Sequence, residues 1–430
     1  PVAVHPVALA GESHDAKIAR LAQDLGPARA AILTLPDSIA WLLNIRGGDI
    51  PHNPVAHAFA ILHADATVTL FMAGSKLDDS VRAHLGARVA LRDPAEFPEA
   101  VGALTGPVRL DPASCPVAVA ERVAEPVEGP DPCLRHKACK TAAELDGARA
   151  AHVRDATAMV RFLAWLDAHA PGDLTEIAVV TRLEAERRAT GALRDIAFDT
   201  IAGSGPHGAI VHYRVTRATD RPLAEGELLL VDSGGQYADG TTDITRTIAI
   251  GSPGAAEIEA FTRVLKGMIA VSRLRFPKGL AGRDIDPFAR AALWAAGLDF
   301  GHGTGHGVGS YLSVHEGPQR IARTGTVALE PGMIVSNEPG FYREGAFGIR
   351  IENLVAVRDA APLPGQTVAH MLAFETLTLV PIDRRLIATD LLTPDERAWL
   401  DAYHTRVRDA VGPLVDGAAA SWLNAACAPL

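Results

Sequence analysis

Four carboxylates and one histidine in the second half of the chain have the types and spacing expected of a site for two divalent metal ions. They are Asp232, Asp243, His306, Glu338 and Glu352. Two carboxylates about 4 Å apart repel each other by roughly 4 kcal/mol at an effective dielectric constant near 20. Bringing four of them together without cations would be very costly, so bound metal is the simplest prediction.

The first two carboxylates flank a predicted β-hairpin. The apolar run 228–231 indicates a buried strand that ends at Asp232, and a connection rich in turn residues covers 234–241. Asp243 then opens the returning strand 243–248. A hairpin of this kind can aim both carboxylates at one point. Aspartate is also common in ordinary turns, so a purely structural role for this pair stays open.

The last two carboxylates flank a second predicted hairpin. The run 333–335 leads to Glu338, a glycine-rich loop is expected next, and 349–352 returns with Glu352. A glutamate inside an apolar strand is seldom left unpaired, which favours a ligand role for Glu352. The repetition suggests that the second domain is built from two similar halves.

A glycine-rich segment lies between the two predicted hairpins and carries histidines. Five of the nine residues in 301–309 are glycine, which excludes a stable helix and therefore a helical zinc site of the HExxH type. His302 and His306 lie in this segment and His315 follows it. Neither a Walker A loop nor a Rossmann turn fits the segment, because the lysine and the helix that they require are missing.

An oxygen-rich ligand set with one imidazole favours harder divalent ions, manganese first, with zinc or cobalt as alternatives. Two such ions about 3.5–4 Å apart can lower the pKa of a shared water and polarise a carbonyl group. The chemistry predicted from the residues is therefore hydrolysis of an amide or an ester.

These residues, in this order, resemble the pita-bread metallopeptidases, a family that includes methionine aminopeptidase, prolidase and aminopeptidase P. The resemblance covers nearly the whole chain. The run 37–51, with Asn44-Ile45-Arg46-Gly47-Gly48-Asp49 at its centre, is similar to the three-domain, cytosolic-type branch of aminopeptidase P. Four further segments look like the ligand-bearing motifs of the family: 232–247, 302–318, 337–340 and 348–353.

The resemblance implies two domains, which suits a chain of 430 residues. An α/β domain of the creatinase/prolidase N-terminal type is expected over 1–133, ending in a proline-rich stretch. An α+β pita-bread catalytic domain is expected over 134–430. Members of this branch carry another α/β domain in front, and the chain begins at Pro1. The expectation is that this first domain is missing here.

The family pattern also implies roles for the candidate ligands. Asp232 would bind one metal ion, and His306 with Glu338 would bind the other. Asp243 and Glu352 would bridge both ions.

Other residues would act on the substrate. Glu338 would carry a proton to the leaving amine, and His315 would stabilise the tetrahedral oxyanion. His302 and His212 would position the substrate around its proline, although the apolar run around His212 by itself indicates a core strand. Arg350 and Tyr342 are further candidates for substrate positioning.

The implied activity is that of an Xaa-Pro aminopeptidase. Such an enzyme uses a metal-bridged hydroxide to hydrolyse the N-terminal Xaa-Pro peptide bond and release the N-terminal residue. Proline makes a special substrate because its peptide bond is a tertiary amide without an N–H, and its ring needs a dedicated slot. One alternative is prolidase action, restricted to Xaa-Pro dipeptides. The other is an inactive pita-bread module that serves protein interaction.

The charge, apolar runs and cysteines of the chain limit the kinds of partner and compartment that we expect. A formal charge of −10 argues against a nucleic-acid partner, and no apolar run approaches the ~20 residues that a membrane span needs. The four cysteines show neither CxxC spacing nor disulfide density, which indicates a reducing compartment and hence the cytoplasm. The family implies a homodimer through the C-terminal domain, with Trp294 as a candidate contact.

Overall fold

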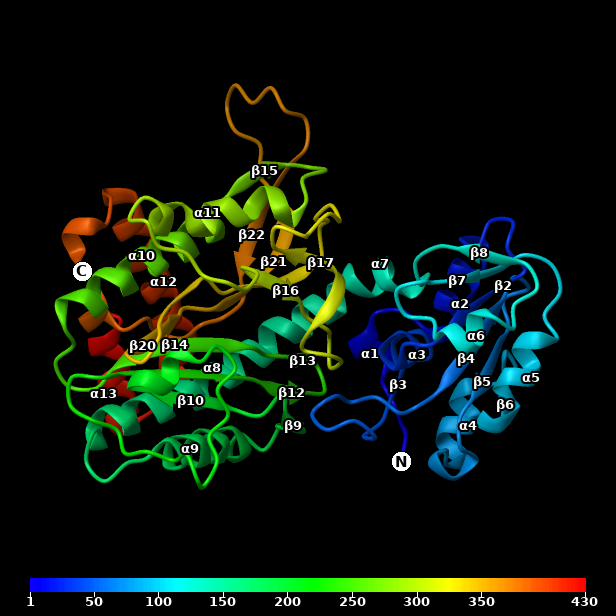
Figure 1. Cartoon of the computed structure of the whole chain (residues 1–430), viewed down its shortest axis with the longest axis horizontal. Helices are drawn as coiled ribbons and strands as arrows, with labels where there is room; N and C mark the ends of the chain where they lie inside the picture. The colour runs from blue at the N-terminus through cyan, green and yellow to red at the C-terminus, as the bar shows by residue number, and fades with distance from the viewer. The chain divides into compact units, whose positions relative to one another are not determined.

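The computed structural model describes residues 1–430. The chain forms two compact units, each shown with its elements in Figure 1. The N-terminal unit comprises Pro1–Gly147 and Gly309–Ser313, and the C-terminal unit comprises Ala148–Val308 and Val314–Leu430. The sequence-based boundary between residues 133 and 134 stays a prediction.

The N-terminal unit is built on a mixed six-stranded sheet in the order β6-β5-β4-β2-β7-β8. Strand β2 alternates sides: Ala31 and Leu33 join the larger apolar cluster, whereas Ala30 and Ile32 join the smaller one. Both faces of the sheet are therefore covered, as the all-buried β2 requires. The strands are β1 (Ala3–Val4), β2 (Ala30–Leu33), β3 (Ile45–Arg46), β4 (Phe59–His63), β5 (Val68–Phe71), β6 (Val89–Arg92), β7 (Val108–Leu110) and β8 (Pro126–Glu128).

Short helices complete this unit, and the expected α/β class is confirmed. Ser13 caps α2 by accepting a hydrogen bond from the Ala16 N–H. The helices are α1 (Val7–Ala10), α2 (His14–Gln23), α3 (Pro36–Leu42), α4 (Asp79–Leu85), α5 (Phe97–Gly102), α6 (Val117–Ala120) and α7 (Cys133–Ala138).

The C-terminal unit is α+β, as expected for a pita-bread domain. Two antiparallel sheets carry the candidate ligands: β10-β11-β14, and the six-stranded β15-β22-β21-β18-β16-β17. Two smaller sheets, β13-β12-β9 and β19-β20, accompany them. The first seven strands of this unit are β9 (Asp195–Ile196), β10 (Ile201–Ser204), β11 (Leu228–Ser233), β12 (Gly235–Tyr237), β13 (Gly240–Thr241), β14 (Ile244–Ala249) and β15 (Arg275–Pro277). The others are β16 (Gly305–Gly307), β17 (Glu316–Ile321), β18 (Ile334–Asn337), β19 (Gly340–Arg343), β20 (Phe347–Arg350), β21 (Asn353–Asp359) and β22 (Met371–Thr376).

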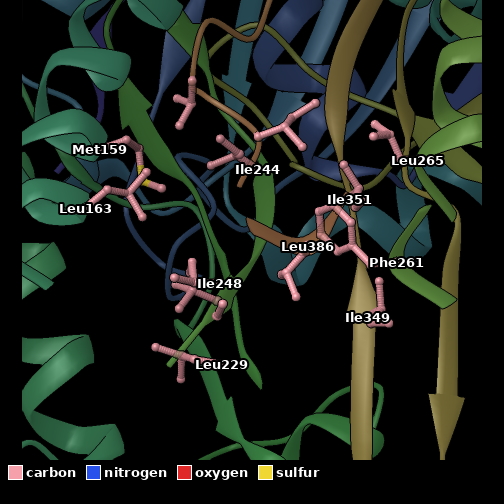
Figure 2. Packing of buried hydrophobic residues seen from close by; sticks show 14 of the residues in the cluster. Met159, Leu163, Leu229, Ile244, Ile248, Phe261, Leu265, Ile349, Ile351 and Leu386 are labelled. Carbon is pink, nitrogen blue, oxygen red and sulfur yellow. The ribbon is translucent and has the colours of Figure 1, made fainter. Parts of the chain in front are cut away.

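Helices pack against these strands through one large apolar core. In Figure 2, Met159 and Leu163 of the long helix α8 lie beside Ile244 and Ile248 of β14, and Phe261 of α10 lies close to β20. Ile244 and Ile248 lie on the same face of β14, and their burial against α8 fixes the strand that leads to the candidate site. The helices are α8 (Ala142–His169), α9 (Glu176–Ala189), α10 (Ala255–Ser272), α11 (Gly282–Trp294), α12 (Pro394–Val411) and α13 (Gly417–Ala426).

Two helices of this unit have a proline near their N-terminal ends. Helix α10 begins at Ala255 after an N-cap at Gly254, so Pro253 lies before the helix rather than at its first position. Helix α11 begins at Gly282 and contains Pro287 in its interior. No helix of the chain has the length and apolar character required to cross a membrane.

Candidate active site

Two antiparallel strand pairs bring the four carboxylates to strand ends. Asp232 lies in β11 opposite Thr245 of β14, and Asp243 directly precedes β14. In the second pair, Asn337 of β18 lies opposite Asn353 of β21, and Glu338 and Glu352 lie just beyond this last pair. The segment between these two glutamates is not the expected loop, because β19 and β20 form a hairpin of their own.

His306 is placed beside these carboxylates by the glycine-rich segment. It lies in β16, whose Gly307 pairs with Val335 of β18. Gly305 must lack a side chain, since a Cβ there would lie 1.8 Å from the carbonyl oxygen of Ser336. The glycines therefore allow this short strand to approach β18 closely, which sets the position of the imidazole.

The five candidate ligands line one cavity of about 710 Å³. Ligand atoms of Asp243, His306 and Glu352 lie within 4.8 Å of one another. The Nε2 of His306 lies 3.5 Å from Oδ2 of Asp243 and 3.4 Å from Oε1 of Glu338. This set of one imidazole and several carboxylates can hold divalent cations.

Two oxygens of the set have no hydrogen-bond partner although they are buried. They are Oδ1 of Asp232 and Oε1 of Glu352. The other oxygen of Glu352 accepts a hydrogen bond of 2.7 Å from the Thr245 hydroxyl, and Oδ2 of Asp232 accepts one of 2.6 Å from Arg350. Buried polar atoms are rarely left unpaired, so these free oxygens fit metal ions as their missing partners.

The electrostatics of the metal-free cluster also point to a shortage of positive charge. Burial raises the pKa of Asp243 to about 7, and the nearby carboxylates oppose its ionisation further. Burial and repulsion from Asp243 raise the pKa of Glu352 well above its ordinary value. Burial lowers the pKa of His306, but Asp243 and Glu338 outweigh it and raise that pKa to about 9. Protons therefore occupy the positions that cations would otherwise take.

Arg350 and Tyr342 connect Asp232 to His302 through hydrogen bonds. The guanidinium of Arg350 is buried and also donates a hydrogen bond of 2.6 Å to the Tyr342 hydroxyl. That hydroxyl lies 2.9 Å from Nε2 of His302. Arg350 thus holds Asp232 in place and Tyr342 holds His302. Arg350 also lines the cavity.

His302 and His315 also line the cavity. The ring of His315 lies with its centroid 4.3 Å from that of His306. Partial burial, and for His315 the adjacent His306, lower the pKa of both His302 and His315. Both rings are therefore neutral at pH 7, and each has one N–H that can donate a hydrogen bond.

The predicted strand around His212 is wrong. A 3₁₀ helix covers Gly205–Ala209 and a turn follows, which leaves His212 exposed on the cavity wall rather than in the core. The apolar run misled because the Ile210 side chain is 54% exposed and Val211 lines the cavity. The same cavity therefore collects every side chain that the sequence singled out as catalytic.

Sequence reasoning missed two hydroxyl groups. Thr245 donates to Glu352 and accepts a 3.1 Å hydrogen bond from Nε of Arg350. The hydroxyl of Ser336 donates to Oε1 of Glu338 and accepts from the backbone N–H of His306, both at 2.9 Å. Their signal was alternation: each lies two residues from a carboxylate ligand along an extended segment.

Family models match almost the entire chain. Metallopeptidase family M24 matches residues 146–359. The creatinase/prolidase N-terminal domain matches residues 1–144, and the C-terminal region of peptidase M24 matches residues 370–430.

Curated relatives match in the same way. A probable Xaa-Pro aminopeptidase P of Laccaria bicolor is 42% identical over 99% of this chain and 68% of its own length. Aminopeptidase P2 of Arabidopsis thaliana is 40% identical over 98% of this chain and 65% of its own length. The chain thus spans about two thirds of the curated relatives it matches.

Solved structures share the fold. X-prolyl aminopeptidase from Caenorhabditis elegans, described as a cytosolic enzyme with a di-nuclear active site, has a TM-score of 0.96 at 35% identity. The match covers 100% of this chain and 73% of that one. A Xaa-Pro dipeptidase from Bacillus anthracis has a TM-score of 0.70 at 23% identity, over 86% of this chain and 99% of that chain, which supports the fold alone.

Proposed function

The chain belongs to the Xaa-Pro aminopeptidase P group of metallopeptidase family M24, and we propose that this metalloaminopeptidase removes the N-terminal residue from peptides with proline in second position. The observation that carries the proposal is the shared cavity. It gathers the four candidate carboxylate ligands, two of which keep an unpaired buried oxygen, with the His306 imidazole and three further histidines.

Five side chains would hold two divalent ions. Asp232 would bind one ion, His306 and Glu338 the other, and Asp243 with Glu352 would bridge them. The bound ions would supply Lewis-acid polarisation of the scissile carbonyl and lower the pKa of a water nucleophile. We propose manganese as the preferred ion because oxygen ligands dominate the set, with zinc and cobalt as the alternatives.

The protein's own groups would then handle protons and charge. Glu338 is held by the Ser336 hydroxyl, and its second oxygen, Oε2, lies 4.0 Å from Nε of Arg350. In this position Glu338 can take a proton from the attacking water and deliver it to the leaving amine. A neutral His315 can donate a hydrogen bond to the oxyanion as negative charge develops on the carbonyl oxygen.

Substrate positioning would fall to His212 and His302, which line the cavity. The amine that leaves when an Xaa-Pro bond breaks is the proline nitrogen, which carries no hydrogen in the peptide. A proton must therefore reach that nitrogen, and the ring must be held in a fixed orientation while it does. Arg350 and Tyr342 support this arrangement by fixing Asp232 and His302.

The decisive assay uses protein freed of metal by a chelator and then supplied with manganese. We expect the protein to release the first residue of an Xaa-Pro-Yaa peptide only after manganese is added, and zinc or cobalt to restore less activity. Absence of peptide cleavage with every ion would contradict the proposed activity.

Peptide length separates this activity from prolidase action. Longer Xaa-Pro-Yaa peptides should be cleaved at least as well as an Xaa-Pro dipeptide under identical conditions. Turnover confined to the dipeptide would favour the prolidase alternative instead.

We also propose a cytoplasmic homodimer formed through the C-terminal domain. Helix α11 exposes two large apolar side chains, Phe288 at 46% and Trp294 at 44%. Exposed apolar surface often marks a protein interface. Light scattering should find a dimer for the wild-type chain and a monomer for Trp294→Glu; an unchanged dimer would place the interface elsewhere.

A further inference from the structure

The segment that carries His212 is a long connection with little regular structure of its own. It runs from the end of β10 at Ser204 to Arg221 and contains only the 3₁₀ helix Gly205–Ala209. Irregular connections longer than about 12–15 residues are uncommon in compact domains and are usually functional or disordered. This connection, the His212 loop (residues 205–220), therefore needs specific contacts to hold one shape.

Alternation divides the side chains of the His212 loop. His212 and Arg214 are exposed and line the cavity, whereas Tyr213 between them is buried with 6% of its side chain exposed. The Tyr213 N–H donates to the carbonyl of Ile210, so this part of the loop is a turn that places Tyr213 and its two neighbours on different sides. Any contact that fixes Tyr213 on the inner side thus presents His212 to the cavity.

The contact that fixes Tyr213 is a buried carboxylate. Glu176, in the first turn of α9, is fully buried, and its Oε2 lies 3.0 Å from the Tyr213 hydroxyl. The same carboxylate accepts hydrogen bonds from the Ser204 N–H at 2.8 Å and from Nδ1 of His207 at 2.9 Å.

The first turn of α9 also holds the far end of the same loop. The backbone N–H of Ile177 donates to Oδ1 of Asp220 at 3.0 Å, and that of Glu176 donates to the carbonyl of Arg221 at 3.1 Å. Both ends of the His212 loop and its midpoint at Tyr213 therefore meet one helix turn. Apolar packing adds little, because the cluster around Tyr213 contains only Ile201 and Leu230 as further buried members.

Tyr342 packs against this small cluster, and its hydroxyl pairs with His302. The two histidines assigned to substrate positioning thus depend on one set of contacts. We propose that Glu176 and Tyr213 are positioning residues that hold His212 at the cavity wall and thereby set how well the enzyme binds the proline end of its substrate. This inference rests on the proposed function for its kinetic readout.

The test compares Tyr213→Phe and Glu176→Gln in two backgrounds, the wild type and His212→Ala. Because Tyr213→Phe keeps the ring and removes only the hydroxyl, we expect kcat/KM for an Xaa-Pro-Yaa peptide to fall about 10-fold, mainly through KM. In the His212→Ala background the further loss should be less than about 2-fold, since the residue being positioned is already absent. Manganese content should not change.

Tyr237→Phe is the matched control. Tyr237 is also buried and donates a 2.8 Å hydrogen bond to a buried carboxylate, that of Asp155, but it does not line the cavity. The control should lower the melting temperature and leave kcat/KM unchanged. An equal loss for Tyr213→Phe in both backgrounds, or no loss at all, would overturn the inference.

Deuterium uptake provides a readout that does not require turnover. Tyr213→Phe and Glu176→Gln should speed exchange over residues 205–220, and Tyr237→Phe should not. If the wild-type protein cleaves no Xaa-Pro peptide, the proposed function fails, and the exchange data alone decide whether Glu176 and Tyr213 hold the loop. Unchanged exchange in both variants would contradict the inference even in an active enzyme.

Discussion

Two clusters of buried carboxylates in the C-terminal unit behave in opposite ways. Asp155 of α8 is buried, yet the Arg187 guanidinium, at 2.8 Å from Oδ1, outweighs the effect of burial and lowers its pKa. Asp243 and Glu352 are equally buried, but burial and repulsion from neighbouring carboxylates raise the pKa of both. Burial is common to the two clusters, so the difference lies in the cation that accompanies each.

The comparison separates a structural carboxylate from a ligand. At Asp155 the chain supplies its own cation and a tyrosine hydroxyl, which leaves no need for a bound ion. At the cavity, Asp232 and Glu352 each keep one buried oxygen without a partner. Where the fold gathers four carboxylates around one guanidinium, an external cation is the missing component.

The largest effect is expected when a bridging ligand is removed. Asp243→Ala or Glu352→Ala should abolish peptide cleavage because each removes a carboxylate that both ions share. Loss of repulsion should leave the metal-free variant at least as stable as the metal-free wild type. Activity assays with elemental analysis check the first point and thermal melting the second; a variant that keeps both ions and full activity would refute the assignment.

The next prediction concerns the buried ion pair between Asp155 and Arg187. Arg187→Leu leaves Asp155 buried without its cation, which should lower the free energy of unfolding by roughly 3–5 kcal/mol. The folded fraction should still bind manganese and cleave peptide normally. Denaturant titration measures the loss, and adding Asp155→Asn to the same chain should recover part of it. A metal-binding defect in Arg187→Leu would show that the two clusters are not independent.

A smaller effect is expected at Thr245. Thr245→Val removes the hydroxyl that donates to Glu352 and accepts from Arg350, while the side chain keeps its shape. Metal affinity should fall about 10–100-fold, as for other groups that orient a ligand. Thr245→Ser should restore most of the affinity in a manganese titration. Equal affinities for the valine and serine variants would assign the residue a packing role.

The smallest effect concerns pH. The pKa of Asp243 in the metal-free fold lies near 7, above its ordinary value of about 3.9, so the folded state retains a proton that the unfolded chain has lost. The contribution of Asp243 to stability is thus present below pH 4 and declines as pH rises towards 7. Manganese should reverse this trend, because its binding displaces the protons and strengthens as pH rises. Melting curves between pH 5 and 8, with and without manganese, test the sign.

Local sequence patterns predicted well the secondary structure that carries the site. The apolar run 228–231 became β11 because burial of an apolar run is decided by neighbouring residues. The turn at His212 was not predicted, since the Glu176 carboxylate that holds the neighbouring Tyr213 lies 37 residues away in the sequence. The hydroxyls of Thr245 and Ser336 were missed for a related reason, because such residues are ordinary in strands until a carboxylate is seen beside them.

The most direct test of the account is an anomalous-scattering map from crystals grown with manganese. Two peaks should lie in the cavity, enclosed by the side chains of Asp232, Asp243, His306, Glu338 and Glu352, with the unpaired oxygens of Asp232 and Glu352 turned towards them. A map with no peak there, or with ions bound only at other surfaces, would contradict the proposed metal centre.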